Sequence, residues 1–448
     1  MKKVWIFVFG ITCMGLNAQK KWSLRECVDY AVEHNLQVIQ NQYSKQVQDA
    51  NLKIAKREYL PSVSGSMSNS ASFGQTLYVN TSVRNDNFSN SSNLSANILV
   101  YNNGRLEKTI RKTEYDVEAS QYDIETVRNN ISLQIAQEYL NTLLNKEIVK
   151  ISRSAVENAQ KQYDRSKITT DVGTTAQTVL AEAEAALARE KQNLKTAEIN
   201  TSRSLFSLAQ LLQLPDYKNF DVEDVNIPDE LTPELRSVDE VLTTAYETQP
   251  QIKAAESRIR SAEAQTEVAK TSFWPTITAS AGVGSFYNNR LNTNITGVDE
   301  FGNIAYERNF FQQYKDNFGQ NIGVSLNVPI FNKGITKLQV EQSKINESIA
   351  KNTFDQQKQS VRESVQKAQF DVDANYEAYL AAVEAAKSSK LSLDFADKSY
   401  AAGRTTIFDL NIARNNYANA AGSVAQAKFN YLFSLKLLNF YAGIPLSL

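Results

Sequence analysis

The stretch that decides the fold is SVSGSMSNSASF, residues 62–73. Val63, Met67 and Ala71 belong to one set of alternate positions, and six serines fill the other set. A period of two residues predicts a β-strand, because successive side chains of a strand point to opposite faces. A segment of about ten residues with one apolar face and one face of small polar side chains is typical of strands that cross a membrane around a water-filled interior.

Three more segments repeat this alternation. Their apolar positions are Leu94, Ala96, Ile98 and Val100; Ile277, Ala279, Ala281 and Val283; and Ile322, Val324, Leu326, Val328 and Ile330. Aromatic residues stand at one end of the four segments (Tyr59, Tyr101, Phe273, Trp274 and Phe331) and at the other (Phe73, Phe286, Tyr287 and Phe318). Two such bands are typical of membrane–water interfaces, although a soluble β-hairpin domain with an aromatic core also fits. Residues 74–92 and 286–318 are expected to form the connecting loops.

The number of strands predicts an oligomer. The smallest bacterial membrane barrels have about eight strands, and this chain supplies four segments of that kind. An open sheet edge cannot face lipid, because its N–H and C=O groups would lack hydrogen-bond partners there. Three chains that together supply twelve strands close the sheet, and we therefore predict a homotrimer.

The chain is built from two copies of one plan. Ala31 corresponds to Ala245 at an offset of 214 residues, and Gly104 corresponds to Gly334 at an offset of 230. Each copy is expected to contain a helix, two strands and a long helical hairpin. The predicted division is a signal peptide at 1–18, a first repeat at 19–213, an acidic linker at 214–236 and a second repeat at 237–448.

The hairpins are predicted from the distribution of glycine and proline. Residues 105–172 and 335–402 contain neither, so each can run as one helix of about 100 Å at 1.5 Å per residue. The first of these helices has apolar residues at spacings of three and four, the pattern of a coiled-coil seam: Leu140, Leu144, Ile148, Ile151 and Ala155. The helices alone fit a fibrous coiled coil equally well.

The N-terminus has the pattern of a secretory signal peptide. Two lysines precede an apolar run, and the predicted cut follows Ala18. A lipidated Cys13 is the alternative. With the signal removed, Cys27 is the one remaining cysteine, which excludes an intrachain disulfide framework. Beyond the signal there is no run of about twenty apolar residues, so a membrane span in the mature chain must consist of strands.

The order and spacing of several motifs resemble those of the TolC family of outer-membrane efflux proteins. They are the strand exits Tyr101-Asn102-Asn103-Gly104 and Phe331-Asn332-Lys333-Gly334, and the segment 400–410, YAAGRTTIFDL. The resemblance covers essentially the whole mature chain. It implies a mainly α subunit with membrane β-strands, in a trimer whose twelve-stranded outer-membrane β-barrel continues as a twelve-helix α-barrel in the periplasm. It also implies two partners: a periplasmic adaptor (membrane fusion) protein and an inner-membrane pump of the RND or ABC class.

In that family the tips of the hairpins close the periplasmic entrance, where acidic side chains surround the pore. The resemblance assigns the gate to Asp409, and Asp171 lies near the corresponding position of the first repeat. Tyr400 and Arg404 are further candidate constriction residues that would latch the closed tip to its neighbours. The alternative is that Tyr400 is a residue of the coiled-coil seam and Arg404 a solvated charge of the tip. The tips that meet the adaptor are Val172-Gly173-Thr174 and Ala402-Gly403-Arg404. A second family carboxylate is replaced here by Ile412, and the first repeat has Val179 where Asp409 stands in the second.

Asp409 has a second interpretation that needs no gate. Thr406 and Asp409 have the spacing of a capping box. In this motif the threonine hydroxyl accepts a hydrogen bond from the backbone N–H of the third helical residue, and the side chain of that residue accepts one from the threonine N–H. The segment Thr174-Thr175-Ala176-Gln177 is a similar candidate start for the other descending helix. Both interpretations of Asp409 remain open, and they are compatible.

No signal for catalysis or for a cofactor is present. The single histidine, His34, is accompanied by no second histidine or cysteine cluster, so no metal site is predicted. There is no P-loop, Rossmann fingerprint or nucleophile elbow, and a net charge of −1 gives no indication of nucleic-acid binding. We therefore expect that the protein is not an enzyme and that it binds no cofactor.

Two functions therefore remain. The first is the outer-membrane channel of a tripartite efflux or type I secretion system, a passive duct in contact with outer-membrane lipid and gated at its periplasmic helical tips. The alternative is a structural coiled-coil envelope protein with a soluble β head. The exported substrate cannot be deduced from the sequence.

Overall fold

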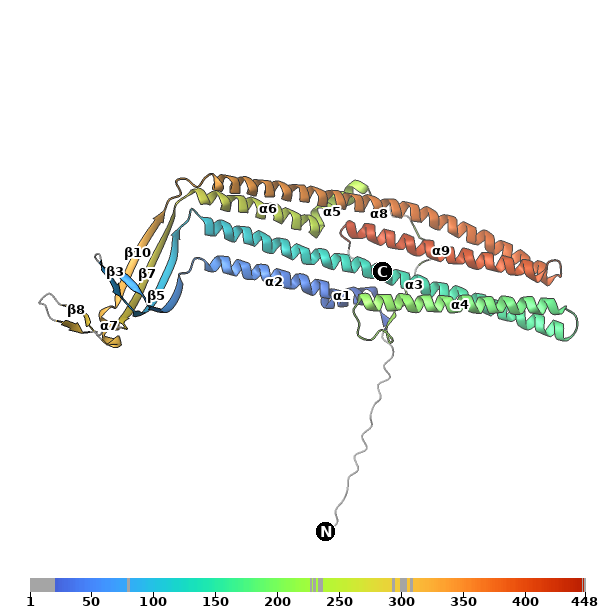
Figure 1. Cartoon of the computed structure of the whole chain (residues 1–448). Helices are drawn as coiled ribbons and strands as arrows, with labels where there is room; N and C mark the ends of the chain where they lie inside the picture. The colour runs from blue at the N-terminus through green and yellow to red at the C-terminus, as the bar shows by residue number, and fades with distance from the viewer. Residues whose placement is uncertain are drawn as a thin grey trace, which may run out of the picture. The chain divides into compact units, whose positions relative to one another are not determined.

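The computed structural model describes residues 21–78, 81–225, 228, 231–232, 237–291, 295–298, 304–306, 309–444 and 446. The predicted signal peptide and Cys13 lie outside these residues. The chain divides into two compact units. Figure 1 labels their helices and strands. Unit 1 comprises the described parts of Met1–Ser44, Ser120–Ala254 and Asp355–Leu448, and unit 2 those of Lys45–Ala119 and Ala255–Phe354.

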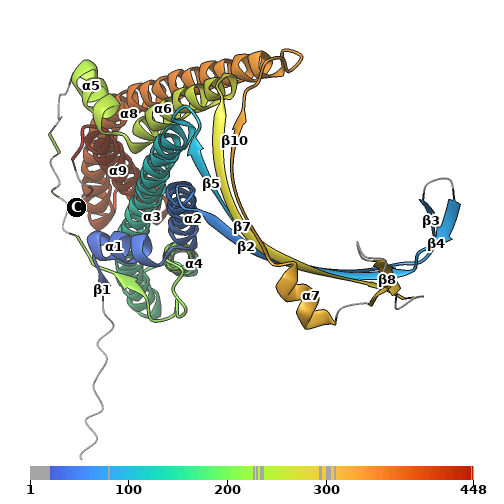
Figure 2. The same ribbon diagram turned by 90° about the vertical axis from the view of Figure 1, so that its left-hand side faces the viewer.

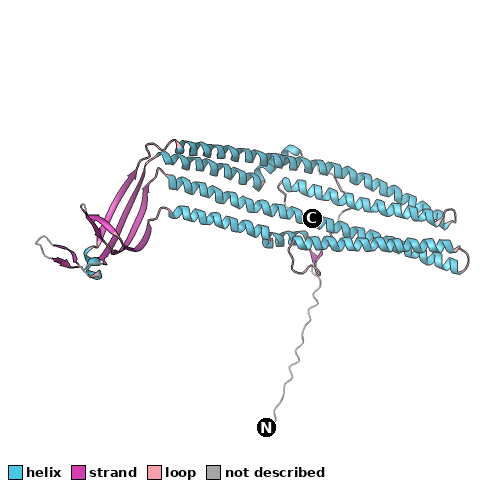
Figure 3. Cartoon of the chain, in the orientation of Figure 1, coloured by secondary structure: helices cyan, strands magenta, loops and turns pink. Residues whose placement is uncertain are grey.

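Unit 2 contains an antiparallel four-stranded sheet in the order β10-β7-β5-β2 (Figure 3). The strands are β2 (Ser62–Ser72), β5 (Asn87–Tyr101), β7 (Thr276–Arg290) and β10 (Gly319–Asn327). Each corresponds to one of the four predicted segments. Two short hairpins, β3 (Gln75–Tyr78) with β4 (Thr81–Arg84) and β8 (Ile295–Val298) with β9 (Ile304–Tyr306), lie between them in the chain.

The expected loop boundaries were wrong. β5 begins at Asn87 and β7 continues to Arg290, so parts of 74–92 and 286–318 are strand. The segment 87–93, NFSNSSN, is almost wholly polar, and hydrophobic alternation therefore gives no signal for it. At the other end β10 stops at Asn327, two residues before Pro329, which has no N–H to donate to a ladder.

The sheet has one apolar and one polar face. The register places Leu94 opposite Val283 and Ile322 opposite Ala281 on the apolar face. Serines pair across the polar face, where the hydroxyls of Ser64 and Ser95 lie 3.1 Å apart. The short helix α7 (Phe310–Asp316) packs on the convex side of the sheet (Figure 2), and the Tyr314 hydroxyl contacts Ser92 at 2.6 Å.

Four helices of unit 2 form a layer in the same order as the strands that they join. They are α2 (Leu36–Arg57), the start of α3 (Arg105–Asp171), α6 (Pro250–Lys270) and the start of α8 (Ile335–Ala401). Ion pairs connect each to the next: Lys56–Glu114 at 3.2 Å, Arg260–Glu118 at 3.2 Å and Lys351–Glu263 at 3.6 Å. The order α2-α3-α6-α8 thus matches β2-β5-β7-β10.

The long helices were predicted from the absence of glycine and proline, and they are present. α3 and α8 have 67 residues each. In unit 1 they return as α4 (Gln177–Leu211) and α9 (Ile407–Tyr441), which completes two helical hairpins. The core of unit 1 includes Leu140 and Leu144 of the predicted seam. Within the described residues, no helix combines the length and the apolar character needed to cross a bilayer.

Two helical joints reflect the repeat. α1 (Leu24–His34) gives way to α2 after Asn35, and α5 (Val238–Thr248) gives way to α6 after Gln249. Both joint residues have extended backbone, with ψ of 128° and 121°. The ring of His34 stacks on Tyr30 at 4.2 Å, so the single histidine occupies a helix end.

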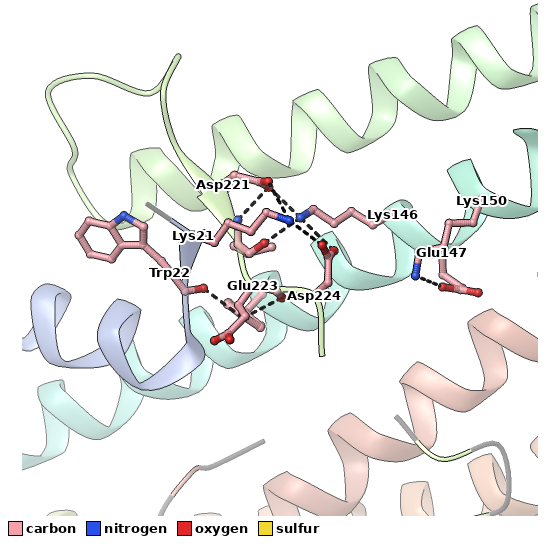
Figure 4. Close-up of polar contacts among 10 residues, drawn as sticks. Lys21, Trp22, Lys146, Glu147, Lys150, Asp221, Glu223 and Asp224 are labelled. Carbon is pink, nitrogen blue, oxygen red and sulfur yellow. Dashed lines mark hydrogen bonds and ion pairs between the residues drawn. The ribbon is translucent and has the colours of Figure 1, made fainter. Parts of the chain in front are cut away.

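The start of the described chain is held by the acidic linker (Figure 4). β1 (Lys21–Trp22) pairs in parallel with β6 (Asp221–Val222). Lys146 of α3 lies 2.7 Å from Asp221 and 3.3 Å from Asp224, and it donates to the Val222 carbonyl. The Lys21 ammonium lies 2.6 Å from Asp224 and, with Lys146, holds the pKa of that carboxyl below its usual range.

Candidate gate at the helical tips

Both hairpin tips are in unit 1, and they turn by the same backbone motif. At the first tip Gly173 has a φ of +77°, which glycine adopts without a steric cost. Its N–H donates to the Thr170 carbonyl at 2.9 Å, and the Thr174 N–H donates to Thr169 at 2.9 Å. This pair of bonds is a Schellman motif, which satisfies the last carbonyl groups of α3.

The second tip repeats the motif 230 residues later. Gly403 has a φ of +67° and donates to the Tyr400 carbonyl at 3.0 Å. The Arg404 N–H donates to Ser399 at 2.9 Å. The backbone of Tyr400 is therefore fixed by the turn itself, which leaves its side chain to make contacts elsewhere.

The two descending helices begin differently. The helix start expected at Thr174 was wrong: α4 begins at Gln177 after Ala176, which makes no side-chain cap. The Thr174 hydroxyl instead donates to the Thr169 carbonyl at 2.8 Å. The first tip thus uses its threonine to close α3 and not to start α4.

At the second tip the predicted capping box is present. The Asp409 N–H donates to the Thr406 hydroxyl oxygen at 3.2 Å, and the Thr406 N–H donates to the Asp409 carboxylate at 3.3 Å. The hydroxyls of Thr406 and Thr405 also donate to that carboxylate, at 2.7 and 2.9 Å. These bonds hold the pKa of Asp409 below its usual range, the Thr406 hydroxyl first among them.

Tyr400 connects the two hairpins. Its hydroxyl accepts a hydrogen bond from the Gln162 side-chain amide at 2.9 Å. Gln162 is a buried residue of α3 and also reaches the buried Ser166 hydroxyl at 3.4 Å. Sequence reasoning missed Gln162, because no local pattern relates two residues 238 positions apart.

The other predicted tip residues are exposed. Arg404, Asp171 and Ala402 all face solvent, and Val172 is 73% exposed. Neither Arg404 nor Asp171 forms an ion pair with a residue that the structure describes. In a single chain these two side chains are therefore available for contacts with other molecules, and no contact joins them to Asp409.

A cavity of about 320 Å³ is lined by residues of both hairpins. Its lining includes Ile412 and Phe408 of α9 and Ile151 of α3. Arg414 also lines it and pairs with Asp397 of α8 at 3.4 Å, and burial lowers the pKa of this arginine. Sequence reasoning missed this pair as well. The position of Arg414, five residues after the expected gate residue Asp409, is a signal that could have identified it.

The fold matches those of solved outer-membrane channels. The CusC structure superposes with a TM-score of 0.76 at 17% identity and covers 94% of this chain and 92% of CusC. The CmeC channel of Campylobacter jejuni gives a TM-score of 0.71 at 21% identity, over 94% of this chain and 85% of CmeC. At these identities the likeness concerns the fold alone.

Relatives identified by sequence point the same way. TolC of Escherichia coli is 26% identical over 316 residues, which span 69% of this chain and 60% of TolC. The efflux protein BepC of Brucella suis is 22% identical over 417 residues, 91% of this chain and 83% of BepC. Both relatives are described as outer-membrane proteins, and BepC as an efflux protein.

The family model described as outer membrane efflux protein matches residues 28–213 and 241–443, one match for each predicted repeat. The two matches together span most of the chain. The chain is a protein of the outer membrane, and it belongs to the outer membrane efflux protein family.

Proposed function

We propose that this chain is one of three subunits of a passive export duct, the outer-membrane channel of a tripartite efflux or type I secretion system. The observation that carries the proposal is the sheet of unit 2. It has one apolar and one polar face, and its four strands hold a single charged residue, Arg290 at the end of β7. Such a sheet suits lipid on one side and water on the other.

The edges of the sheet support a trimer. β2 and β10 are the outer strands, and both are exposed along nearly their whole length. In lipid, each edge needs a partner strand. We propose that β2 of one subunit pairs with β10 of the next, which gives twelve strands in all. The helix layer of unit 2 has the same order as the strands, so the same ring of three subunits extends into a twelve-helix periplasmic barrel.

The two repeats, 19–213 and 237–448, each contribute one hairpin tip to the periplasmic entrance. We propose that three copies of Asp409 surround the closed pore and attract cations. Tyr400 and Gln162 hold the two hairpins of a subunit together in the closed state. Val172, Gly173, Ala402 and Arg404 are exposed at the ends of the hairpins, and with Thr174 and Asp171 they form the surface offered to a periplasmic adaptor.

The energy for export comes from a partner under this proposal. A periplasmic adaptor would connect the tips to an inner-membrane pump of the RND or ABC class, and the cargo would be set by that pump. OpmQ, a 24% identical relative from Pseudomonas aeruginosa, is described as a pyoverdine export protein. We extend only the export role, and not the cargo, to this chain.

Two neighbouring residues of β10 provide a test of the sheet's orientation. Val324 lies on the apolar face and Ser325 on the polar face, one position apart. A lysine on the lipid side near the middle of a membrane strand costs about 2–4 kcal/mol, whereas a lysine in the lumen changes selectivity. Ser325→Lys should therefore insert into planar bilayers and conduct with reduced cation selectivity, and Val324→Lys should insert poorly. Equal behaviour of the two variants, or a protein that gives no conductance at all, contradicts the proposal.

A further inference from the structure

The basic residues of unit 2 gather where the helices meet the strands. We define the collar as the last eight residues of α2 and α6, the first eight of α3 and α8, and the residues that connect them to the sheet: 50–61, 102–112, 263–275 and 328–342. The collar holds ten lysines and arginines against five aspartates and glutamates, in a chain whose net charge is −1. The described residues of the segments at the opposite end of the strands (73–78, 81–86, 291, 295–298, 304–306 and 309–318) hold two basic and two acidic residues. Among the described residues, the excess of positive charge therefore lies at the helix end of the sheet.

Each of the four connections between helix and strand carries a cation. Arg57 ends α2, Lys270 ends α6, Arg105 begins α3, and Lys333 precedes α8. Lys270 is neutralised by Glu267 at 2.5 Å. Arg57, Arg105 and Lys333 are exposed and form no ion pair with any residue that the structure describes.

Lys337 on the first turn of α8 adds a fourth exposed cation with no such partner. Other collar cations are already compensated: Lys112 lies 2.8 Å from Asp116, and Lys108 lies 3.6 Å from Glu267. Lys53 of α2 is also exposed and without such a partner, four residues before the end of its helix. The four cations nearer the strands, Arg57, Arg105, Lys333 and Lys337, are here named the junction cations, and they are left to attract an external anion.

The backbone at Lys333 supports a role for its charge. Lys333 has a φ of 59°, in the left-handed region that a lysine rarely adopts. Asn103 has the corresponding place in the first repeat, with a φ of 53°, and asparagine tolerates this region far better. The second repeat therefore has a lysine at a position where the first repeat has asparagine, the residue that is better suited to this backbone conformation. A strained residue of this kind is a reason to look for a function.

The collar contains most of the band of aromatic side chains at the same end of the strands, and Tyr101 directly precedes its second segment. Tyr59, Tyr101, Phe273 and Trp274 are between 44% and 55% exposed, and Phe331 is 85% exposed. Aromatic rings of this kind lie at the headgroup level of a membrane. Cations immediately beside such a band lie where phospholipid phosphates are found, and anionic lipids attract them by about 1 kcal/mol each.

We propose that the junction cations bind the headgroups of anionic phospholipids in the periplasmic leaflet of the outer membrane. The inference rests on the proposed function, because that function makes this end of the strands the periplasmic one. The result is a band of positive charge, repeated in each subunit, that fixes the depth of the sheet in the membrane.

Trp274 allows a direct test, since it belongs to the aromatic band and lies within the collar. The purified protein with Trp22→Phe is reconstituted in phosphatidylcholine vesicles that contain phosphatidylglycerol, with bromine on the chains of one lipid or the other. Quenching of Trp274 then measures which lipid surrounds it. We expect about a fivefold preference for phosphatidylglycerol, the factor expected for roughly 1 kcal/mol of attraction, and a loss of this preference at high salt.

Both brominated lipids should quench Trp274 equally in the quadruple variant Arg57→Gln/Arg105→Gln/Lys333→Gln/Lys337→Gln. The matched control removes four exposed cations of unit 1, Lys191→Gln/Arg203→Gln/Lys367→Gln/Lys390→Gln, and should keep the preference. Lys333→Asn, which copies the residue of the first repeat, is the control for misfolding of the quadruple variant. It should reduce the preference for phosphatidylglycerol without loss of stability.

The outcomes separate the two claims. The lipid inference is overturned if both lipids quench the wild type equally. It is also overturned if the quadruple variant keeps its preference for phosphatidylglycerol, or if that variant differs from the wild type only in having lost its oligomeric state. If neither brominated lipid quenches Trp274, the proposed placement of the strands in the membrane is itself wrong.

Discussion

The hydroxyl of Tyr400 lies 2.9 Å from the amide nitrogen of Gln162, and this hydrogen bond joins α8 to α3. Tyr400 stands at the end of its helix, three positions before the turn at Gly403. Gln162 is buried on the other hairpin and is held by Ser166. The two hairpins of one chain are therefore joined by a hydrogen bond close to their tips, where we propose that the gate lies.

Loss of this bond should favour the open state. Tyr400→Phe keeps the ring and removes the hydroxyl, and a hydrogen bond of this kind contributes about 0.5–1.5 kcal/mol. We expect the open-to-closed ratio in single-channel recordings to rise roughly two- to tenfold. Tyr163→Phe, which removes a hydroxyl from a neighbouring position of α3, should leave the ratio unchanged. The interpretation fails if both variants behave like the wild type.

Asp409 can be tested for both of its roles at once. Thr406→Ala removes the cap and should destabilise the start of α9 by about 0.5–2 kcal/mol, with little effect on ion selectivity at neutral pH. Asp409→Asn removes the charge and should weaken cation selectivity and block by divalent cations. Reversal potentials in a salt gradient measure the selectivity. Unchanged selectivity in Asp409→Asn means that Asp409 is a helix cap only.

The pH dependence follows from the hydroxyl bonds to Asp409. These bonds lower its pKa below the ordinary value of 3.8, so the cap is fully formed above that value and is lost as pH falls through the lower folded value. Thr405→Ala removes one of the donors and should raise the pKa. Divalent block should then fade at a higher pH in the variant than in the wild type. A shift in the opposite direction, or none, contradicts the assignment.

The ion cluster at the linker offers a matched pair of lysines. Lys146 is 15% exposed between Asp221 and Asp224, whereas Lys150, one turn further on, is 65% exposed beside Glu147. Lys146→Met removes the least exposed cation of the cluster and leaves Asp221 with Lys21 alone, at 4.0 Å, so it should cost about 1–3 kcal/mol of unfolding free energy. Lys150→Met should cost less than about 1 kcal/mol. Denaturant unfolding in detergent measures both, and equal costs would show that the cluster does not stabilise unit 1.

Much of the fold was predictable because its signals are periodic. The serine alternation at 62–73 identifies β2, and the glycine-free, proline-free runs identify α3 and α8 almost to the residue. Polar strand ends such as 87–93 were missed because serine and asparagine occupy both faces, so only the hydrogen-bonded ladder reveals them.

The candidate site was less predictable. The turns at Gly173 and Gly403 and the cap at Asp409 depend on local sequence, and local sequence revealed them. The contacts Gln162–Tyr400 and Arg414–Asp397 depend on which helices lie side by side. A single sequence does not contain that information. The arrangement of the tips around a pore depends on other subunits and stays a prediction.

The most direct test of the account is a disulfide between the two edges of the sheet. In a Cys27→Ala background, Ser66→Cys in β2 is combined in turn with Asn321→Cys, Gly323→Cys and Ser325→Cys in β10, all on the polar face. Because β7 and β5 separate these strands within a chain, pairing of β2 with β10 requires two subunits. We predict that one combination, oxidised in membranes, runs as a covalent trimer on denaturing gels until it is reduced. Exclusively monomeric protein in all three combinations would contradict a barrel shared by three chains.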